Sequence, residues 1–329
     1  MEGIDPARRN GFTTGRIGQK VLKLVGLRGS EWAAGVLPRA DARQTFSFGP
    51  GAYDLMMAKD FRFGVGLQVG RRRQSVQDFA RRVEDMGYDV LHMADHLYTT
   101  APFPMLTAVA LATERLRVGT FVLNAGFYRP ALLARDVTSL RDLSGGRFEL
   151  GLGAGYVKEE FEQAELPFPT AGQRVAWLGH VTEHFHEHVP DVPILIAGNG
   201  DKLLTLAARR AHIIGLTGGA PVGPDFDPLA DRITFVREAA GERLDELELN
   251  LAVTAMPTDD SGLPDMSITR QFLPGLSDEE LLRTPAVLSG STKEIADTIR
   301  GYRETYGVTY ITVQQRHAEA FAKVIAELR

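Results

Sequence analysis

The sequence lacks cysteine altogether among its 329 residues. Disulfide bonds, thiolate-bound zinc, iron–sulfur clusters and a cysteine nucleophile are therefore excluded. Acidic residues slightly outnumber basic ones, 42 to 37, and give a net charge of -5. This charge gives no support for general binding to nucleic acid or to a membrane surface. No apolar run approaches the roughly 20 residues that a bilayer-spanning helix needs. We expect a cytoplasmic protein without nucleic-acid or membrane partners.

Residues 1–57 differ in composition from the rest of the chain. Between Arg8 and Arg43, eight basic residues stand against two acidic ones, Glu31 and Asp41. The basic residues are Arg8, Arg9, Arg16, Lys20, Lys23, Arg28, Arg39 and Arg43. No uninterrupted apolar stretch fits a secretory signal. Two interpretations stay open: a poorly ordered extension, translated from upstream of a natural start at Met56 or Met57, or a basic arm that binds a partner or caps the core.

From residue 58 onward, strand-like and helix-like segments alternate, which predicts a parallel sheet with covering helices. The predicted strands are 61–68, 88–93, 116–123, 147–153, 192–197, 212–216, 247–255 and 308–314. The helices between and after them are expected at 76–86, 104–112, 131–143, 174–186, 201–210, 229–240, 293–306 and 318–328, with Ser75 and Thr292 as N-caps. Eight such units in about 270 residues have the size of a (β/α)8 TIM barrel. Residues 156–172 and 257–288 are predicted to be lid-like insertions.

In a TIM barrel the active site lies where the strands end, so the residues that follow each predicted strand are candidates for chemistry. Asp95 and His96 follow the second strand and could transfer a proton, although a carboxylate capping a turn beside an exposed histidine explains them equally well from the residues alone. Gly198-Asn199-Gly200 precedes a helix and could bind a phosphate, although a plain turn is an alternative. Gly151, Gly153 and Gly155 alternate at the end of the fourth strand, which suits a flat ring or tight packing.

A histidine-rich helix is the other notable pattern. His180, His184 and His188 recur every four residues and could share one helix face. Because the H-E-x-x-H spacing of zinc hydrolases is absent, we interpret them as a solvated face and predict no metal site.

Several segments together resemble the luciferase-like monooxygenase superfamily, specifically its coenzyme F420-dependent oxidoreductase branch, over roughly residues 61–329. The matching segments are Gly87-Tyr88-Asp89, Ala94-Asp95-His96-Leu97, Leu116-Arg117-Val118-Gly119-Thr120, Arg129-Pro130-Ala131-Leu132-Leu133-Ala134, Leu143-Ser144-Gly145-Gly146-Arg147, Gly151-Leu152-Gly153-Ala154-Gly155, Ile196-Ala197-Gly198 and Val287-Leu288-Ser289-Gly290-Ser291.

The resemblance implies a barrel that binds F420, or alternatively FMN, at its strand ends. His96 is then the acid/base candidate, and Asp95 lies beside the ring as a cofactor and orientation contact. A non-proline cis peptide is implied near Phe121-Val122, behind the ring. The implied contacts to the ring or its side chain are Val122, Asn124, Gly153, Ala154, Gly155 and Tyr156. The implied phosphate contacts are Gly198, Asn199, Gly200, Thr217 and Gly218.

Two departures from the family pattern concern the substrate. Tyr156 stands where relatives carry a glutamate, and residues 188–193 replace a longer segment expected to wall the pocket. The resemblance therefore implies hydride transfer between the deazaflavin and a small organic, natural-product or peptide-derived substrate, with alkene or imine reduction as one form. An FMN-dependent monooxygenase and a non-catalytic flavin-binding barrel are the alternatives. Relatives are often homodimers.

Overall fold

The structure is a computed structural model that describes residues 60–68, 73–219, 223 and 226–329. Its strands are β1 (Arg62–Gly66), β2 (Val90–Met93), β3 (Arg117–Thr120), β4 (Leu123–Asn124), β5 (Phe148–Gly153), β6 (Ile194–Ala197), β7 (Ile213–Leu216), β8 (Glu248–Ala252) and β9 (Val308–Gln314). The longer helices are α3 (Arg73–Asp85), α4 (Pro102–Ala110), α5 (Pro130–Leu143), α7 (Ala171–His188), α8 (Asp201–Arg210), α9 (Pro228–Ala240), α12 (Thr292–Tyr306) and α13 (Ala318–Leu328). Shorter helices are α6 (Lys158–Gln163), α10 (Ser267–Phe272) and α11 (Asp278–Leu282).

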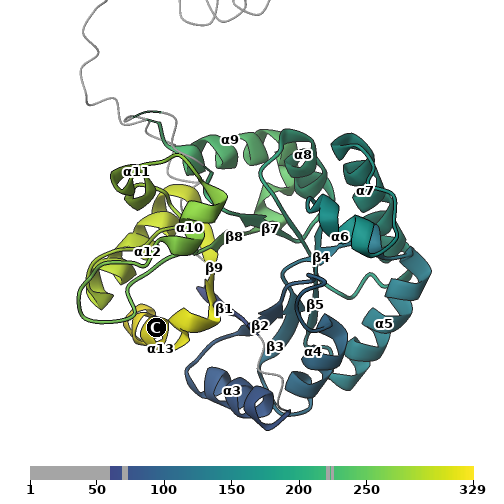
Figure 1. Ribbon diagram of the computed structural model, residues 1–329, viewed down its shortest axis with the longest axis horizontal. Helices are drawn as coiled ribbons and strands as arrows, with labels where there is room; N and C mark the ends of the chain where they lie inside the picture. The colour runs from purple at the N-terminus through teal and green to yellow at the C-terminus, as the bar shows by residue number, and fades with distance from the viewer. Residues whose placement is uncertain (1–59, 69–72, 220–222, 224–225) are drawn as a thin grey trace, which may run out of the picture. The chain divides into compact units, whose positions relative to one another are not determined.

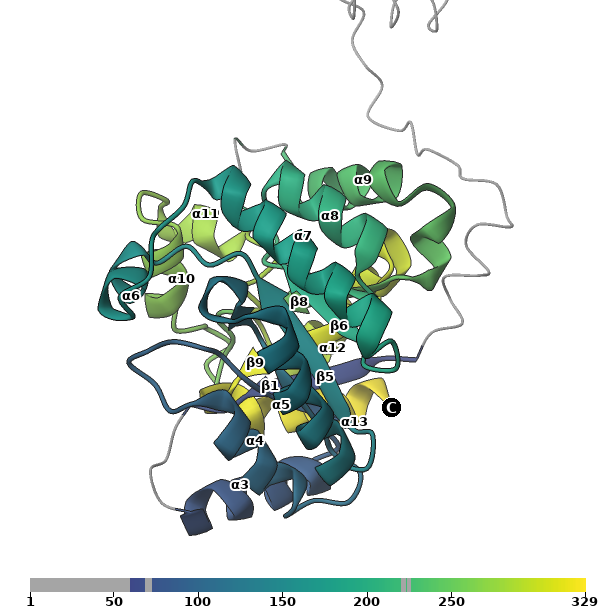
Figure 2. The same ribbon diagram turned by 90° about the vertical axis from the view of Figure 1, so that its right-hand side faces the viewer.

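All strand pairings are parallel, and the sheet closes on itself. The strand order runs from β3 through β2, β1, β9, β8, β7, β6 and β5 to β4, and a further pairing of β3 with β5 completes the ring. Viewed along the barrel axis, the helices surround the strands (Figure 1). The side view shows α7 and α8 packed along one flank, while α6, α10 and α11 gather near the same end of the barrel (Figure 2). β3 and β4 are two halves of one barrel position, so the predicted eight-stranded TIM barrel is confirmed.

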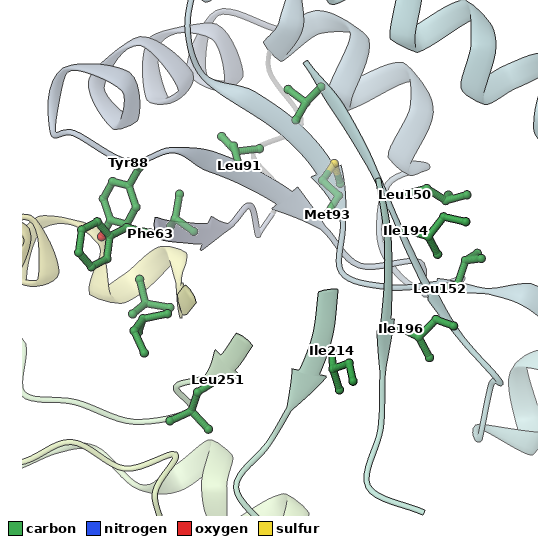
Figure 3. Close-up of a cluster of buried hydrophobic side chains, with 14 of the residues drawn as sticks. Phe63, Tyr88, Leu91, Met93, Leu150, Leu152, Ile194, Ile196, Ile214 and Leu251 are labelled. Carbon is green, nitrogen blue, oxygen red and sulfur yellow. The ribbon is translucent and has the colours of Figure 1, made fainter. Parts of the chain in front are cut away.

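The core has two layers because side chains alternate between the faces of each strand. Leu91 and Met93 on β2, and Ile194 and Ile196 on β6, belong to the large cluster between barrel and helices (Figure 3). The intervening Leu195 belongs to a smaller cluster inside the barrel. That inner cluster also contains Val90, Ile213 and Tyr310, with Phe121, Val122 and Ala197 packed against it. The two layers fix which residues of each strand point into the barrel.

Charged and polar side chains fill the amino-terminal end of the barrel interior. Arg62 forms ion pairs with Glu149 and Glu248, and Arg117 also pairs with Glu149. Above them the Tyr310 hydroxyl and His92 Nε2 are 2.7 Å apart. These charged groups are paired with one another at this end of the barrel, whereas a TIM barrel carries its active site at the opposite end.

Most predicted elements agree with the structure to within a few residues, but the two predicted N-caps, Ser75 and Thr292, were wrong. Ser75 lies inside α3, which begins at Arg73, so it is not an N-cap. Thr292 is the first residue of α12; the N-cap is Ser291, whose hydroxyl accepts a hydrogen bond from the Glu294 amide while the Glu294 carboxylate accepts one from the Ser291 amide. These two hydrogen bonds form a capping box, which requires a serine or threonine three residues before a glutamate or glutamine. Ser291 stands three residues before Glu294, whereas Thr292 stands only two residues before it.

The predicted boundary at residue 57 lies outside the described residues. Within those residues, no helix is long and apolar enough to cross a membrane.

Candidate active site

The carboxyl ends of the parallel strands bring together segments that are distant in the sequence. Residues 94–96 follow β2, Asn124 ends β4, residues 154–156 follow β5, residues 198–200 follow β6, and residues 217–218 follow β7. Since all these strands run in the same direction, their following loops meet at one rim. The residues predicted for the site therefore share one end of the barrel.

Asp95 is attached to the neighbouring strand at this rim. Its backbone N–H donates to the Val122 carbonyl at 3.4 Å, and its carboxylate accepts from the Asn124 N–H at 3.3 Å. Burial raises the pKa of Asp95, opposed by a hydrogen bond from the Tyr128 hydroxyl. Burial and the nearby Asp95 raise the pKa of Tyr128 in turn, so the phenol remains a donor. These contacts hold Asp95 as an oriented acceptor near β4.

His96 pairs with a carboxylate that the sequence did not single out. Its Nδ1 lies 3.0 and 3.2 Å from the two carboxylate oxygens of Glu160. The ring of Tyr98 stacks on the imidazole, with ring centroids 4.9 Å apart. The His96 side chain is 24% exposed and that of Glu160 only 7%. His96 thus has one nitrogen engaged with the protein at a rim that solvent reaches, which suits proton transfer.

Glu160 belongs to α6, inside the insertion expected at 156–172. The resemblance implies a glutamate directly after β5, at the position of Tyr156. The carboxylate that contacts His96 instead belongs to Glu160, four residues further along the chain. The acidic first turn of α6, Glu159 and Glu160, was the available signal. Periodicity could not identify it because its partner His96 is 64 residues away.

The third barrel strand is interrupted where the resemblance predicted a distortion. The peptide bond between Phe121 and Val122 is cis, and it separates β3 from β4. Both side chains pack against the inner cluster, and Phe121 stacks on His92 with ring centroids 5.2 Å apart. This expectation is confirmed.

Asn124 and the glycine-rich end of β5 pack closely on one another. A Cβ on Gly155 would lie 2.2 Å from Asn124 Oδ1, and the φ of Gly155 is +74°. The same Asn124 oxygen accepts a hydrogen bond from the Gly126 N–H at 3.0 Å. A Cβ on Gly153 would lie 2.8 Å from Val122. Packing between the strand ends therefore favours a bare backbone at Gly153 and Gly155, and their contact with a ring stays a prediction.

Tyr156 marks the outer edge of the site. Its side chain is 69% exposed, and Tyr98 across the rim is 78% exposed. Burial of the hydroxyl region and the nearby Glu160 raise the pKa of both tyrosines. Ala154, between the rim and the strand, packs against the main core.

The loops expected to bind phosphate divide into open and closed positions. Gly200 is the N-cap of α8, has no side chain to satisfy the first-turn N–H groups, and has open space around it. Asn199 and Thr217 hydrogen-bond to each other and join the two loops. A Cβ on Gly198 would lie 3.0 Å from Leu203, and a Cβ on Gly218 would lie 3.0 Å from Pro285.

Asp201 is the first residue of α8 and does not cap the helix. Its carboxylate forms an ion pair with Arg232 from α9 at 2.6 Å. The negative charge beside the helix start is therefore compensated.

The histidines of α7 do not meet in a threefold arrangement. His184 and His188 stack with ring centroids 4.1 Å apart, while His180 contacts Trp177. In the described residues, no group of three or more metal-ligating side chains is arranged to hold an ion.

The crossing from α7 to β6 also differs from its expected role. α7 ends at His188 and β6 begins at Ile194, so residues 189–193 enter the barrel at the amino-terminal ends of the strands. A longer segment inserted there would lie at the end opposite to His96, so its absence does not open the wall of this site.

A family model and curated relatives match this chain in sequence. A sequence model of the family described as luciferase-like monooxygenase matches residues 56–262. The chain is 26% identical over 218 residues to 5,10-methylenetetrahydromethanopterin reductase from Archaeoglobus fulgidus, covering 60% of this chain and 64% of that one. It is 28% identical over 227 residues to F420-dependent glucose-6-phosphate dehydrogenase from Nakamurella multipartita, covering 59% and 67%. The chain thus spans slightly under two thirds of the first of these relatives.

Solved structures share the fold. The F420-dependent tetrahydromethanopterin reductase from Methanopyrus kandleri superposes with a TM-score of 0.68 at 18% identity, covering 82% of this chain and all of that one. The monooxygenase RslO1 from Streptomyces bottropensis gives a TM-score of 0.60 at 18% identity, covering 81% and 99%.

Proposed function

Because this chain belongs to the luciferase-like monooxygenase family, we propose that it is an F420-dependent oxidoreductase whose reaction takes place beside His96. The observation that carries the proposal is the pairing of His96 with Glu160 at the carboxyl ends of the strands, next to the oriented carboxylate of Asp95. The curated relatives whose names specify F420 support the choice of cofactor. The substrate is a small organic or natural-product molecule.

The residues at the rim fit a flat cofactor with a phosphorylated side chain. The open Gly200 at the uncapped start of α8, with Asn199 and Thr217 beside it, would hold the phosphate. The half-buried Val122 would support the ring from below, with Asp95 and Asn124 at its edge. Gly153, Gly155, Gly198 and Gly218 would shape these loops through their packing, and Ala154 and Tyr156 would lie along the edge of the ring.

The protein's own groups supply orientation and a proton. Bound F420 would supply, or accept, a hydride at a ring carbon. His96 would exchange a proton with the substrate, because its exposed position and one engaged nitrogen leave the other nitrogen available. Asp95, held by Asn124 and Tyr128, would orient a polar group at the ring edge and keep its own position during the reaction. Either alkene or imine reduction would use a proton in this way.

A second candidate is an FMN-dependent monooxygenase. The fold similarity to RslO1 and to EDTA monooxygenase from Chelativorans sp. BNC1, with TM-scores of 0.60 and 0.61, favours it. The two candidates differ in cofactor and in oxygen consumption, so both can be measured on the same preparation.

The test is a substrate screen with the reduced F420 complex of the full chain, repeated with His96→Gln. We expect the wild type to oxidise reduced F420 in the presence of an unsaturated or imine substrate. His96→Gln should lose about 100-fold or more in kcat, because a general acid contributes that much, while its affinity for F420 stays within about twofold. Tight FMN binding with oxygen uptake would replace the F420 proposal by the monooxygenase. Binding of F420 without turnover on any substrate would leave a non-catalytic barrel.

A further inference from the structure

The contact between Glu160 and His96 constrains the histidine more tightly than a surface ion pair would. Both carboxylate oxygens lie within 3.2 Å of the same nitrogen, Nδ1. One of these oxygens also accepts a hydrogen bond from the Leu97 N–H at 3.2 Å. The Glu160 side chain is nearly buried, so solvent does not compete effectively for these contacts.

Aromatic packing holds Glu160 in this position. Its neighbour Phe161 is buried between Phe127 and Phe168, with ring centroids 5.3 and 5.2 Å away. Gly126 makes room for that ring, since a Cβ there would lie 2.6 Å from Phe161. The position of the carboxylate is therefore set by the docking of α6 on the segment that follows β4.

The other titratable groups around His96 come from three segments. Asp95 and Tyr98 lie on its own loop, Tyr156 lies after β5, and Glu160 lies on α6. The two tyrosines remain neutral donors near pH 7, because burial and Glu160 raise the pKa of both. Two carboxylates, both near His96, are therefore the sources of charge that can act on it.

We propose that Glu160 is the positioning residue of His96: its carboxylate holds a hydrogen on Nδ1 and thereby assigns proton exchange with the substrate to Nε2. The chemical reason is that an ionised carboxylate can only accept hydrogen bonds, so Nδ1 must carry the donor. A hydrogen-bond acceptor on one ring nitrogen of a reacting histidine fixes both the tautomer and the orientation of the ring. This inference rests on the proposed function for the identity of the reaction, but its geometry does not depend on the cofactor.

The proton balance of the step follows from this assignment. In the proposed reduction, bound reduced deazaflavin would supply the hydride, and with it the two electrons that the substrate gains. The accompanying proton leaves Nε2 of the His96 imidazolium for the substrate atom next to the new C–H bond. His96 becomes neutral with its hydrogen on Nδ1, and Glu160 stays ionised throughout.

The test reads the tautomer directly in the full chain without cofactor. Protein labelled with 15N-histidine is followed by two-bond 1H–15N correlation spectra from pH 5 to 9, and His96→Gln identifies the His96 signals. We expect neutral His96 to carry its hydrogen on Nδ1. In Glu160→Gln the amide oxygen can still accept from Nδ1, so the Nδ1 tautomer should persist. Glu160→Ala should lose the tautomer preference as well.

Glu159→Gln is the matched control, since Glu159 is an exposed neighbour in the same helical turn. It should leave the tautomer unchanged. A wild-type protein with the neutral hydrogen on Nε2, or a Glu160→Ala variant that keeps the Nδ1 tautomer, would overturn the inference. Failure of the chain to bind F420 would instead refute the proposed function and leave the tautomer result as measured.

Discussion

Two histidines four residues apart occupy opposite environments in the barrel. His92 lies inside, 2% exposed, with Nε2 bonded to the Tyr310 hydroxyl and its ring stacked on Phe121. His96 lies at the rim and contacts Glu160. Burial, and secondarily the charge of Arg62, lowers the pKa of His92 to about 3. His92 therefore serves the interior as a neutral group, and the rim histidine is the one that can exchange protons with a ligand.

Buried neutral histidines make stability depend on pH. Burial lowers the pKa of His92 to about 3 and that of His317 to about 4, below the roughly 6.5 of an unfolded chain. The unfolded chain therefore takes up these protons first, so the stabilisation is complete above about pH 6.5 and is lost as the pH falls. Between pH 6.5 and 5, we expect the free energy of unfolding to drop by up to about 1.4 kcal/mol per pH unit for each histidine.

Urea unfolding at pH 7, 6 and 5 measures this slope. His317→Gln should reduce it by close to one proton, whatever the variant's absolute stability. An unchanged slope in that variant would mean that His317 is accessible to protons in the folded protein.

The start of α12 gives a second test at a single residue. Ser291→Ala should lower the free energy of unfolding by about 1 kcal/mol, because the hydroxyl that caps the Glu294 amide is lost. Thr292→Ala should be close to neutral, since threonine at the first helical position makes no cap. Thermal unfolding of the two variants compares them, and a larger loss in Thr292→Ala would contradict the assignment of the cap.

At the scale of elements, the barrel closes where β3, β4 and β5 meet, and the glycines there are packing residues. A Cβ on Gly151 would lie 1.8 Å from the Thr120 carbonyl oxygen, while Thr120 Oγ1 both donates to the Gly151 carbonyl and accepts from its N–H, each at 2.8 Å. This junction leaves no room for a side chain without moving backbone.

The glycine junction predicts a large difference between two Gly→Ala substitutions. Gly151→Ala should destabilise the fold by about 3 kcal/mol or more, because overpacking against backbone cannot relax. Gly301→Ala, in α12 with nothing within 4 Å, should raise stability by up to about 1 kcal/mol through helix propensity. Circular dichroism melts measure both, and a wild-type melting temperature in Gly151→Ala would show that the junction is looser than described.

The sequence predicted the elements well because each strand and helix has its own periodicity. It placed Asp95 and His96 after β2 because a strand end is a local feature. It missed Glu160, whose place depends on Phe161 docking against Gly126 from a distant part of the chain. It also could not distinguish packing from binding at Gly153 and Gly155, since both uses require a bare backbone. The position of Glu160 thus depends on long-range packing, which no local sequence pattern records.

At the scale of the whole molecule, the two ends of the barrel have separate tasks. The amino-terminal end contains the paired charges of Arg62, Arg117, Glu149 and Glu248. The carboxyl-terminal end carries Asp95, His96 and Glu160 together with the open start of α8. The insertion that contains α6 supplies Glu160 to this second end and is therefore part of the candidate site (Figure 2).

Binding of a deazaflavin at this rim is tested most directly by equilibrium titration of the full chain with F420 and with FMN. Fluorescence reports the binding. We predict saturable binding of F420, with a Kd at least about tenfold lower than that of FMN, a difference of about 1.4 kcal/mol. Asp95→Asn should weaken binding of F420, and Glu159→Gln should leave it unchanged. Tight binding of FMN with no detectable affinity for F420 would contradict the claim.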